Sequence, residues 1–149
     1  LGKGAKSFKT DIKTDVLITN KRNLYLVLLT ADCLPIAVSD SKNRVIALVH
    51  GSKHNIEAII KNTIGEMIKH FKTDPKDLVV NIGPSIGPCH YEIDLWAKAE
   101  DELISLGIKK KNIYNPRICT FEAADYYSYR RSKASGTPDD RFATIFGMK

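Results

Sequence analysis

The stretch Thr30-Ala31-Asp32-Cys33-Leu34-Pro35 decides how the rest of the chain is organised. Before it, residues 24–29 form an almost unbroken apolar run. The run is short, rich in β-forming residues and bounded by polar ones, which predicts a buried strand. Asp32 and Cys33 stand where that strand stops. Because Pro35 has no N–H to donate and biases the residue before it towards extended backbone, we expect the chain to turn there.

The residues that follow predict a hairpin. Residues 36–38 are apolar, residues 39–43 are turn formers, and residues 44–49 make a third strand that ends at His50. Two strands joined by a tight turn are antiparallel neighbours, so their outer ends meet at one edge of the sheet. Cys33 and His50 flank those two ends. We therefore expect their side chains to lie close together.

A thiol and an imidazole that meet at a strand edge have three plausible roles. Together they can bind a borderline or soft metal ion such as zinc or copper. Alternatively, they form a nucleophile and its base, as in thiol enzymes. The third interpretation is structural, with Cys33 a small core residue and His50 a hydrogen-bonded strand end, because free cysteines are commonly buried and inert. The spacing alone leaves all three open.

Length and composition favour a single domain. The chain has 149 residues and a net charge of +6, mostly from lysine, which is enough for one domain with a real core. It contains no apolar run of membrane length, so we expect no membrane partner. Three irregularly spaced cysteines do not indicate a disulfide framework, which favours a cytoplasmic location. The one tight basic cluster, Lys109-Lys110-Lys111, lacks interleaved aromatic residues, so we expect no nucleic-acid partner.

The clearest helix signal covers residues 55–71, where apolar residues recur at helical spacing. Asn55 is its expected N-cap, and the helix begins just after His50. The free N–H groups of its first turn are expected to hold phosphate or carboxylate near the Cys33–His50 pair.

Two more helices are predicted. Residues 94–106 carry a cap at Asp94 and a stop at Gly107. Residues 121–131 fit a helix with Arg130 and Arg131 at its C-terminal end. Two neighbouring guanidinium groups can bind phosphate, and favourable placement at a helix end is the alternative.

The second half of the chain also contains a ligand-loop candidate. Residues 78–82 predict a strand that runs into Gly83-Pro84-Ser85-Ile86-Gly87-Pro88, and such a loop lets the backbone approach a ligand. Cys89 and His90 follow. Adjacent side chains of an extended segment point in different directions, so at most one of them is expected to bind a metal. We place both in the pocket wall, or behind the metal ligands.

The remaining segments are short. Residues 109–117 predict an exposed loop, residues 118–120 an extended piece with Cys119 buried, and residues 142–146 a last strand.

Four motifs occur here in order: Thr30-Ala31-Asp32-Cys33-Leu34-Pro35, Val49-His50, Gly83-Pro84-Ser85-Ile86-Gly87-Pro88-Cys89 and Ser128-Tyr129-Arg130-Arg131. Together they resemble the laccase-domain family, whose members are also described as multicopper polyphenol oxidase-like or purine nucleoside phosphorylase-like. The resemblance covers the chain from about Asp15 onwards. It implies an α/β (α+β) fold, a layered sandwich of mixed or antiparallel β-sheets flanked by helices. Residues 1–149 would form one such domain without its N-terminal part.

The resemblance also implies a metal ion, zinc with copper as the alternative, held by His, Cys and His. Cys33 matches the cysteine and His50 the second histidine of that set. No histidine precedes Cys33, so the third ligand is expected upstream of Leu1. The family has Trp and Arg soon after the second histidine, whereas this chain has Gly51-Ser52-Lys53-His54-Asn55. Any stacking or anion-binding role of that pair falls to Lys53 or His54.

The function that the resemblance implies is a metal-dependent purine nucleoside enzyme. It would phosphorolyse adenosine, inosine or methylthioadenosine, deaminate adenosine, or both, with a purine nucleoside and phosphate as partners in a monomer or homodimer. Its catalytic residues would be Asp32, Cys33 and His50, with Asp32 as the proton shuttle. Its substrate- or phosphate-binding residues would be Asn55, Ser85, Arg130 and Arg131. Without the Trp–Arg pair, we expect phosphorolysis to be weakened more than deamination.

Three alternatives remain open at this point: a metal-free Cys–His thiol enzyme, a copper polyphenol oxidase, and a degenerate binding module without catalysis.

Overall fold

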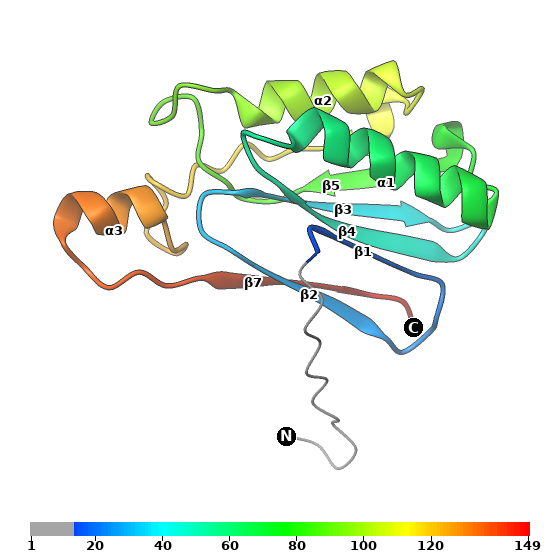
Figure 1. Cartoon of the computed structure of the whole chain (residues 1–149), viewed down its shortest axis with the longest axis horizontal. Coiled ribbons are helices and arrows are strands. Elements are labelled where there is room, and N and C mark those ends of the chain that lie inside the picture. Colours follow the sequence, from blue (N-terminus) through cyan, green and yellow to red (C-terminus); the bar gives the residue numbers. More distant parts are fainter. Residues whose placement is uncertain (1–13) are drawn as a thin grey trace, which may run out of the picture.

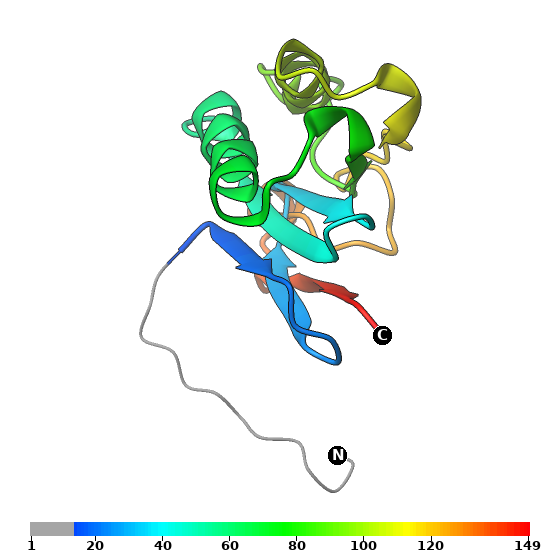
Figure 2. The same ribbon diagram turned by 90° about the vertical axis from the view of Figure 1, so that its right-hand side faces the viewer.

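The computed structural model describes residues 14–149. The elements stack in three layers (Figure 1). Helices α1 (Ile56–Phe71) and α2 (Leu95–Ser105) cover one face of a five-stranded sheet. A ribbon of β2 (Tyr25–Thr30) and β7 (Phe142–Gly147) packs on the other face, and Figure 2 shows the same layers from the side. The predicted layered α+β fold is confirmed.

The larger sheet is mixed. Its strand order is β1 (Val16–Thr19), β4 (Val45–Gly51), β3 (Leu34–Asp40), β5 (Val79–Ile82) and β6 (Ile113–Tyr114). All neighbours are antiparallel except β5 and β6, which run parallel. β3 and β4 are the predicted hairpin, and they lie at the centre of the sheet.

Strand β4 is buried on both faces. Val45, Ala47 and Val49 pack towards the helices, and Ile46 and Leu48 pack towards the β2–β7 ribbon. Fully burying an aliphatic side chain of the size of Val, Leu or Ile contributes about 1.5–3 kcal/mol. The strand that carries His50 is therefore held firmly from both sides.

Residues 24–29 were predicted to be a buried strand, but only one face of this strand is buried. β2 alternates: Leu26 is buried, whereas Val27 and Leu29 are 49% and 59% exposed. The reason is that β2 pairs with β7 in a two-stranded ribbon, and only one side of this ribbon meets the large sheet. An unbroken apolar run does not reveal which of its residues lack a covering layer.

The turn expected at Pro35 lies earlier. Residues 31–33 form it, and Asp32 adopts a left-handed φ of 84° there. Pro35 lies inside β3, opposite His50 of β4.

At the other end of the hairpin, Asp40 closes the turn. Its Oδ1 accepts a hydrogen bond from the backbone N–H of Asn43 at 3.0 Å, and its Oδ2 accepts one from the Asn43 side chain at 2.8 Å. Burial by itself raises the pKa of Asp40, but the hydrogen bonds, chiefly those from Asn43, outweigh burial and lower this pKa below its ordinary value.

Helices α1 and α2 lie where they were predicted, and the Asp94 side chain caps α2 by accepting from the Ala97 N–H. The third helix was predicted wrongly. α3 is Tyr129–Ser135, and its N-cap is Ser128, whose hydroxyl accepts from the Arg131 N–H at 3.2 Å. Residues 121–127 form turns instead. Arg130 and Arg131 therefore lie in the first turn of this helix, not the last.

The remaining connections hold short 3-10 turns, η1 (Pro75–Asp77) and η2 (Lys110–Asn112). The loop predicted for residues 109–117 thus contains η2 and β6. Among residues 14–149, no helix has both the length and the apolar character needed to cross a membrane.

Candidate active site

A pocket of about 660 Å³ lies beside α3. The turn between β2 and β3, the loop after β4, the loop after β5 and α3 itself contribute to its wall, and these segments meet at the same end of the sheet (Figure 1). Its wall includes Asp32 and Cys33 from the first of these segments, and Lys53 and His54 from the second. The ends of β2, β3 and β4 therefore converge on one cavity.

The hairpin brings Cys33 and His50 together, as expected. The register pairs Pro35 with His50 and Leu34 with Gly51, so Cys33 lies just beyond the end of the ladder. The neighbouring Cys33 thiol is the main reason that the pKa of His50 rises to about 9, although burial opposes the rise. Nδ1 of His50 lies 2.9 Å from Oδ1 of Asp15. When that nitrogen donates to Asp15, the other ring nitrogen is left for Cys33 or for a metal ion.

Asn55 occupies the N-cap position of α1, as expected, but its side chain makes no capping hydrogen bond. Its Oδ1 accepts from the backbone N–H of Ser52 at 2.7 Å, and its Nδ2 donates to Oδ2 of Asp15 at 3.2 Å. The N–H of Ile56, the first residue of α1, donates to the Ser52 carbonyl at 3.0 Å. Asn55 and the start of α1 thus stabilise the loop after β4, and Asn55 is not part of the pocket wall described above.

Asp32 is buried and fully engaged by the protein. Its Oδ1 accepts from the Thr120 hydroxyl at 2.7 Å, and its Oδ2 accepts from the Arg130 N–H at 2.8 Å. Its carbonyl accepts from the Ile86 N–H at 3.0 Å. A non-glycine residue in the left-handed region costs on the order of 1–3 kcal/mol, and these bonds hold Asp32 there. Its role as a proton shuttle stays a prediction.

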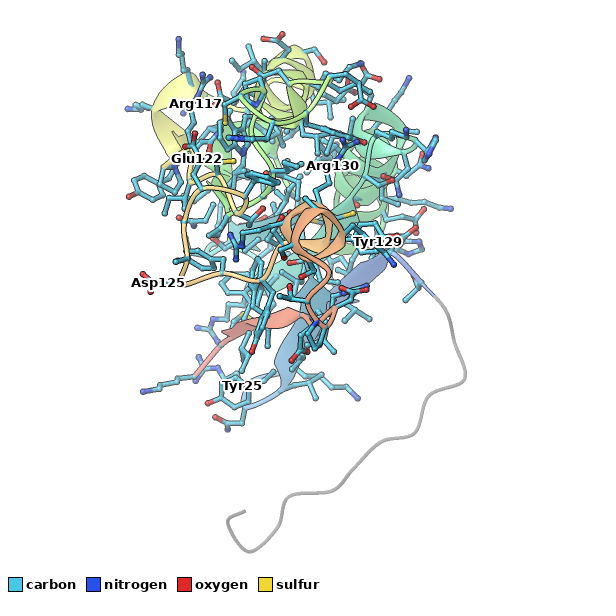
Figure 3. All side chains as sticks on the ribbon, turned by 90° about the vertical axis from the view of Figure 1, so that its left-hand side faces the viewer. Tyr25, Arg117, Glu122, Asp125, Tyr129 and Arg130 are labelled. Carbon is cyan, nitrogen blue, oxygen red and sulfur yellow. The ribbon has the colours of Figure 1, made fainter. Side chains whose placement is uncertain are left out.

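The two neighbouring arginines have different surroundings. Arg130 lines the pocket, lies 4.5 Å from the centre of the Tyr91 ring and pairs with Glu92 at 3.3 Å. Figure 3 looks onto the α3 end of the molecule, with Tyr129 and Arg130 on this helix and Glu122 on the loop before it. The Arg131 guanidinium instead donates to the carbonyls of Thr120, Phe121, Ala123 and Tyr126. Arg131 holds the turns that precede α3 and does not line the pocket.

Ser85 is not brought to the pocket either. It is completely buried, and its hydroxyl accepts from Nε1 of Trp96 at 2.8 Å. Its backbone forms a parallel bridge with Cys119, which is buried as predicted.

Cys89 and His90 lie in a turn, closed by a 3.0 Å hydrogen bond from the His90 N–H to the Gly87 carbonyl. The prediction that at most one of them binds a metal assumed an extended segment, and the structure has a turn there instead. Potential ligand atoms of Cys89, His90 and Cys119 all lie within 4.8 Å of one another. Desolvation and the hydrogen bond with Cys119 raise the pKa of Cys89 to about 11. Cys119 is brought to this turn by the long-range bridge between Ser85 and Cys119. No local sequence pattern predicts such a contact.

Sequence reasoning also missed the aromatic wall of the pocket. Tyr91, Phe121 and Tyr129 all line it. The signal that could have identified Tyr91 and Tyr129 is their place next to the motif residues His90 and Arg130.

Comparison with known proteins places this architecture in a family. The model of the family described as multi-copper polyphenol oxidoreductase laccase matches residues 3–94 and 90–148. A purine nucleoside phosphorylase of Clostridium acetobutylicum is 32% identical over 155 aligned residues, which cover 87% of this chain and 66% of that protein. The purine nucleoside phosphorylase YlmD of Bacillus subtilis is 27% identical over 180 aligned residues, which cover 99% of this chain and 64% of that protein.

Solved structures show the same fold. YfiH of Bacillus licheniformis matches with a TM-score of 0.85 at 23% identity, over 91% of this chain and 62% of that one. YlmD of Geobacillus stearothermophilus matches with a TM-score of 0.84 at 22% identity, over 92% of this chain and 62% of that one. The chain spans between 51% and 66% of the length of the first two curated relatives. Because the family model covers nearly the whole sequence, the chain belongs to the multi-copper polyphenol oxidoreductase laccase family.

Proposed function

We propose that this chain is part of a metal-dependent enzyme that phosphorolyses purine nucleosides, and that the pocket beside α3 is its active site. The observation that carries the proposal is the make-up of one cavity. Cys33, which contacts His50, shares its wall with three aromatic rings and with the cations Lys53 and Arg130. The relatives described above as purine nucleoside phosphorylases support the same reaction.

The pocket has the size and the surfaces that this substrate needs. Small-molecule sites typically measure about 300–1,000 Å³, and this one measures about 660 Å³. Tyr91, Phe121 and Tyr129 offer faces or edges to a purine ring, which stacks favourably on aromatic side chains. The sequence alone led us to expect weak phosphorolysis, since the Arg after His50 is missing. Arg130 offers an alternative guanidinium from α3.

Cys33 and His50 at the end of the hairpin are two ligands of the kind that zinc prefers. Thiolate and imidazole are typical zinc ligands, and a catalytic zinc takes three protein ligands with an open position. Asp15 on Nδ1 of His50 is the arrangement that usually orients a metal-binding histidine. Residues 14–149 supply Cys33 and His50, and we propose that the third ligand is a histidine from another part of the protein. When bound, zinc would supply a Lewis acid beside the nucleoside.

In phosphorolysis, a phosphate oxygen forms a bond to C1′ of the ribose while the bond from C1′ to the purine nitrogen breaks. The bonding pair leaves with the purine, which takes up a proton, and the products are the free base and ribose 1-phosphate. Arg130 and Lys53 would hold and orient the phosphate, because a guanidinium fork matches phosphate oxygens. Both Asp32 oxygens already accept hydrogen bonds, so we place Asp32 as the residue that positions Cys33 and Arg130.

Glu92 pairs with both cations that we propose for phosphate. Its two oxygens face Lys53 at 3.7 Å and Arg130 at 3.3 Å. Phosphate has to displace this carboxylate from both cations. We expect Glu92→Gln to lower the KM for phosphate several-fold without raising it for the nucleoside. Glu66→Gln, which removes the partner of His70 on the exposed side of α1, is the matched control.

The test uses the full-length, zinc-loaded protein with adenosine, in the presence and absence of phosphate. Chromatography should find adenine and ribose 1-phosphate only when phosphate is present. Cys33→Ala should abolish turnover, and Arg130→Ala should raise the KM for phosphate at least tenfold. Formation of inosine with no dependence on phosphate would show a deaminase instead, and no conversion of any purine nucleoside would overturn the proposal.

A second candidate rests on the Asp15–His50–Cys33 chain of contacts. A nucleophile, a base and a carboxylate that orients the base are the parts of a thiol hydrolase. In that case the activity survives removal of metal by a chelator and is lost on alkylation of Cys33. Loss of activity on chelation, with recovery on addition of zinc, excludes this candidate.

A further inference from the structure

We propose that Cys89, His90 and Cys119 form a second metal site, separate from the Cys33–His50 pair, for a thiophilic ion such as Zn²⁺. A sulfur from each cysteine and a ring nitrogen of His90 all lie within 4.8 Å of one another. Among residues 14–149, no other group of three or more His, Cys, Asp or Glu side chains converges in this way. The proposal does not depend on the reaction proposed above.

Two separate backbone constraints build the cluster. The turn from Gly87 to His90 places two consecutive side chains on one side, which an extended segment cannot do. The parallel bridge between Ser85 and Cys119 then brings in the third donor, with the Thr120 N–H bonded to the Ser85 carbonyl at 3.0 Å. Main-chain bonds thus bring the three residues together, and only small side-chain movements are needed to place their donor atoms around an ion.

The sulfur of Cys119 already faces a backbone donor. The Gly87 N–H donates to its Sγ at 3.3 Å, and Cys119 is only 6% exposed. This hydrogen bond orients the sulfur and would stabilise its negative charge once it is bound to a metal ion.

His90 has an unsatisfied nitrogen. Its Nδ1 is buried and has no hydrogen-bond partner in the described part of the chain. The nearest charged group is Oε1 of Glu122, at 3.8 Å, which is too far for a hydrogen bond. Stacking on Phe121, with ring centres 4.1 Å apart, fixes the orientation of the imidazole. A buried polar atom without a partner calls for an explanation, and a bound ion in this cluster, with Glu122 drawn towards the ring, provides one.

The donor chemistry selects the ion. Two sulfurs and one imidazole favour Zn²⁺ or Cu⁺ over Mg²⁺, Ca²⁺ or Mn²⁺, which prefer oxygen. With bonds of about 2.0–2.3 Å, ligand atoms on a tetrahedral zinc lie roughly 3.3–3.8 Å apart. The atoms of the cluster therefore have to move together by about 1 Å, which rotation of the exposed Cys89 side chain allows. The Glu122 carboxylate or a water molecule would complete the four ligands.

The site would stiffen one wall of the pocket. His90 and Phe121 both line the cavity. An ion bound to Cys89, His90 and Cys119 would cross-link the loop after β5 to the segment before α3, across positions that are distant in the sequence. This is the role of a structural zinc: it holds two segments together and leaves substrate chemistry to other residues.

The experiment titrates the reduced, metal-free full-length protein with Co²⁺ and follows thiolate-to-cobalt charge-transfer absorption. The Cys33→Ser variant should still bind one equivalent, with the intensity of two thiolates, and Zn²⁺ should displace the cobalt. Cys89→Ser should lose that equivalent and keep the signal of the Cys33 site. His90→Ala should weaken binding at least tenfold relative to His70→Ala.

Two results would overturn the proposal. One is a Cys33→Ser variant that binds no cobalt. The other is unchanged binding in both Cys89→Ser and His90→Ala. Cys89 is exposed, so its replacement by serine is not expected to prevent folding, and circular dichroism checks this. Alkylation of Cys89 in Cys33→Ser gives an independent readout: Zn²⁺ should slow it at least tenfold, and a rate unaffected by Zn²⁺ contradicts the site.

Discussion

The Thr120 hydroxyl donates a 2.7 Å hydrogen bond to Oδ1 of Asp32, and both residues are buried. The contact joins the turn that carries Cys33 to the segment that carries Cys119. It therefore links the two proposed metal sites through two side chains that are not themselves proposed metal ligands. Because Asp32 is held in a left-handed conformation, the bond also maintains a backbone geometry that the chain does not adopt readily.

Replacing Thr120 by Val keeps the shape of the side chain and removes the donor. The buried Asp32 oxygen then lacks one partner, which costs about 1–3 kcal/mol in the free energy of unfolding. Urea denaturation measures the loss. Thr137→Val, at an exposed position, is the control and should change the free energy by less than about 0.5 kcal/mol. Equal stability of Thr120→Val and the wild type would show that the bond is not important.

The hairpin should lose stability in acid through Asp40. Its folded pKa is lowered, so its carboxylate stabilises the fold above the unfolded pKa of about 3.9, and this contribution is lost as the pH falls through the lower folded value. Asp40→Asn should therefore be less stable than the wild type by about 1–2 kcal/mol at pH 7. The difference should shrink below pH about 4. Urea denaturation at pH 7 and below pH about 4 measures this difference in the free energy of unfolding, with Asp101→Asn as an exposed control. A difference that does not depend on pH contradicts the assignment.

Two glycines should respond to alanine in opposite directions. A Cβ on Gly87 would lie 2.5 Å from the Trp96 ring and 3.2 Å from Sγ of Cys89. Gly87→Ala should cost about 1–3 kcal/mol through overpacking and should also weaken cobalt binding at the Cys89 cluster. A Cβ on Gly65 of α1 meets nothing within 4 Å. Gly65→Ala should stabilise the protein by about 0.5–1 kcal/mol, because alanine is the better helix former. Thermal unfolding of the two variants gives both signs.

Substitutions at Arg130 should affect phosphate binding, whereas substitutions at Arg131 should affect stability. Arg131→Lys cannot reproduce the fork of donors to several carbonyls and should lower the free energy of unfolding by about 1–3 kcal/mol. Arg130→Lys should leave the melting temperature nearly unchanged and raise the KM for phosphate. Thermal melting and steady-state kinetics on both variants test the pair. The reverse pattern would mean that the assignments of Arg130 and Arg131 must be exchanged.

Local patterns predicted those parts of the fold that depend on local physics. The helical spacing of residues 55–71 and the cap at Asp94 are properties of short segments, and both helices lie where they were expected. The hairpin likewise follows from neighbouring strands, so the proximity of Cys33 and His50 could be predicted. The start of α3 was missed because Ser128 as a cap competes with apolar spacing further upstream. The partners of Arg131, and the arrival of Cys119 beside Cys89, are set by tertiary contacts that no local pattern contains.

The pairing of β2 with β7 has a consequence for synthesis of the protein. Tyr25 lies opposite Gly147, so β2 has no partner in its ribbon until β7 has been synthesised and has left the ribosome. At translation rates of about 5–20 residues per second, β2 waits for roughly 6–25 seconds. During that time its unpaired edge and its apolar residues, including Val27 and Leu29, are open to other chains. We expect the nascent chain to depend on a chaperone in this interval, and substitutions that make the outer face of β2 polar should raise the yield of folded protein.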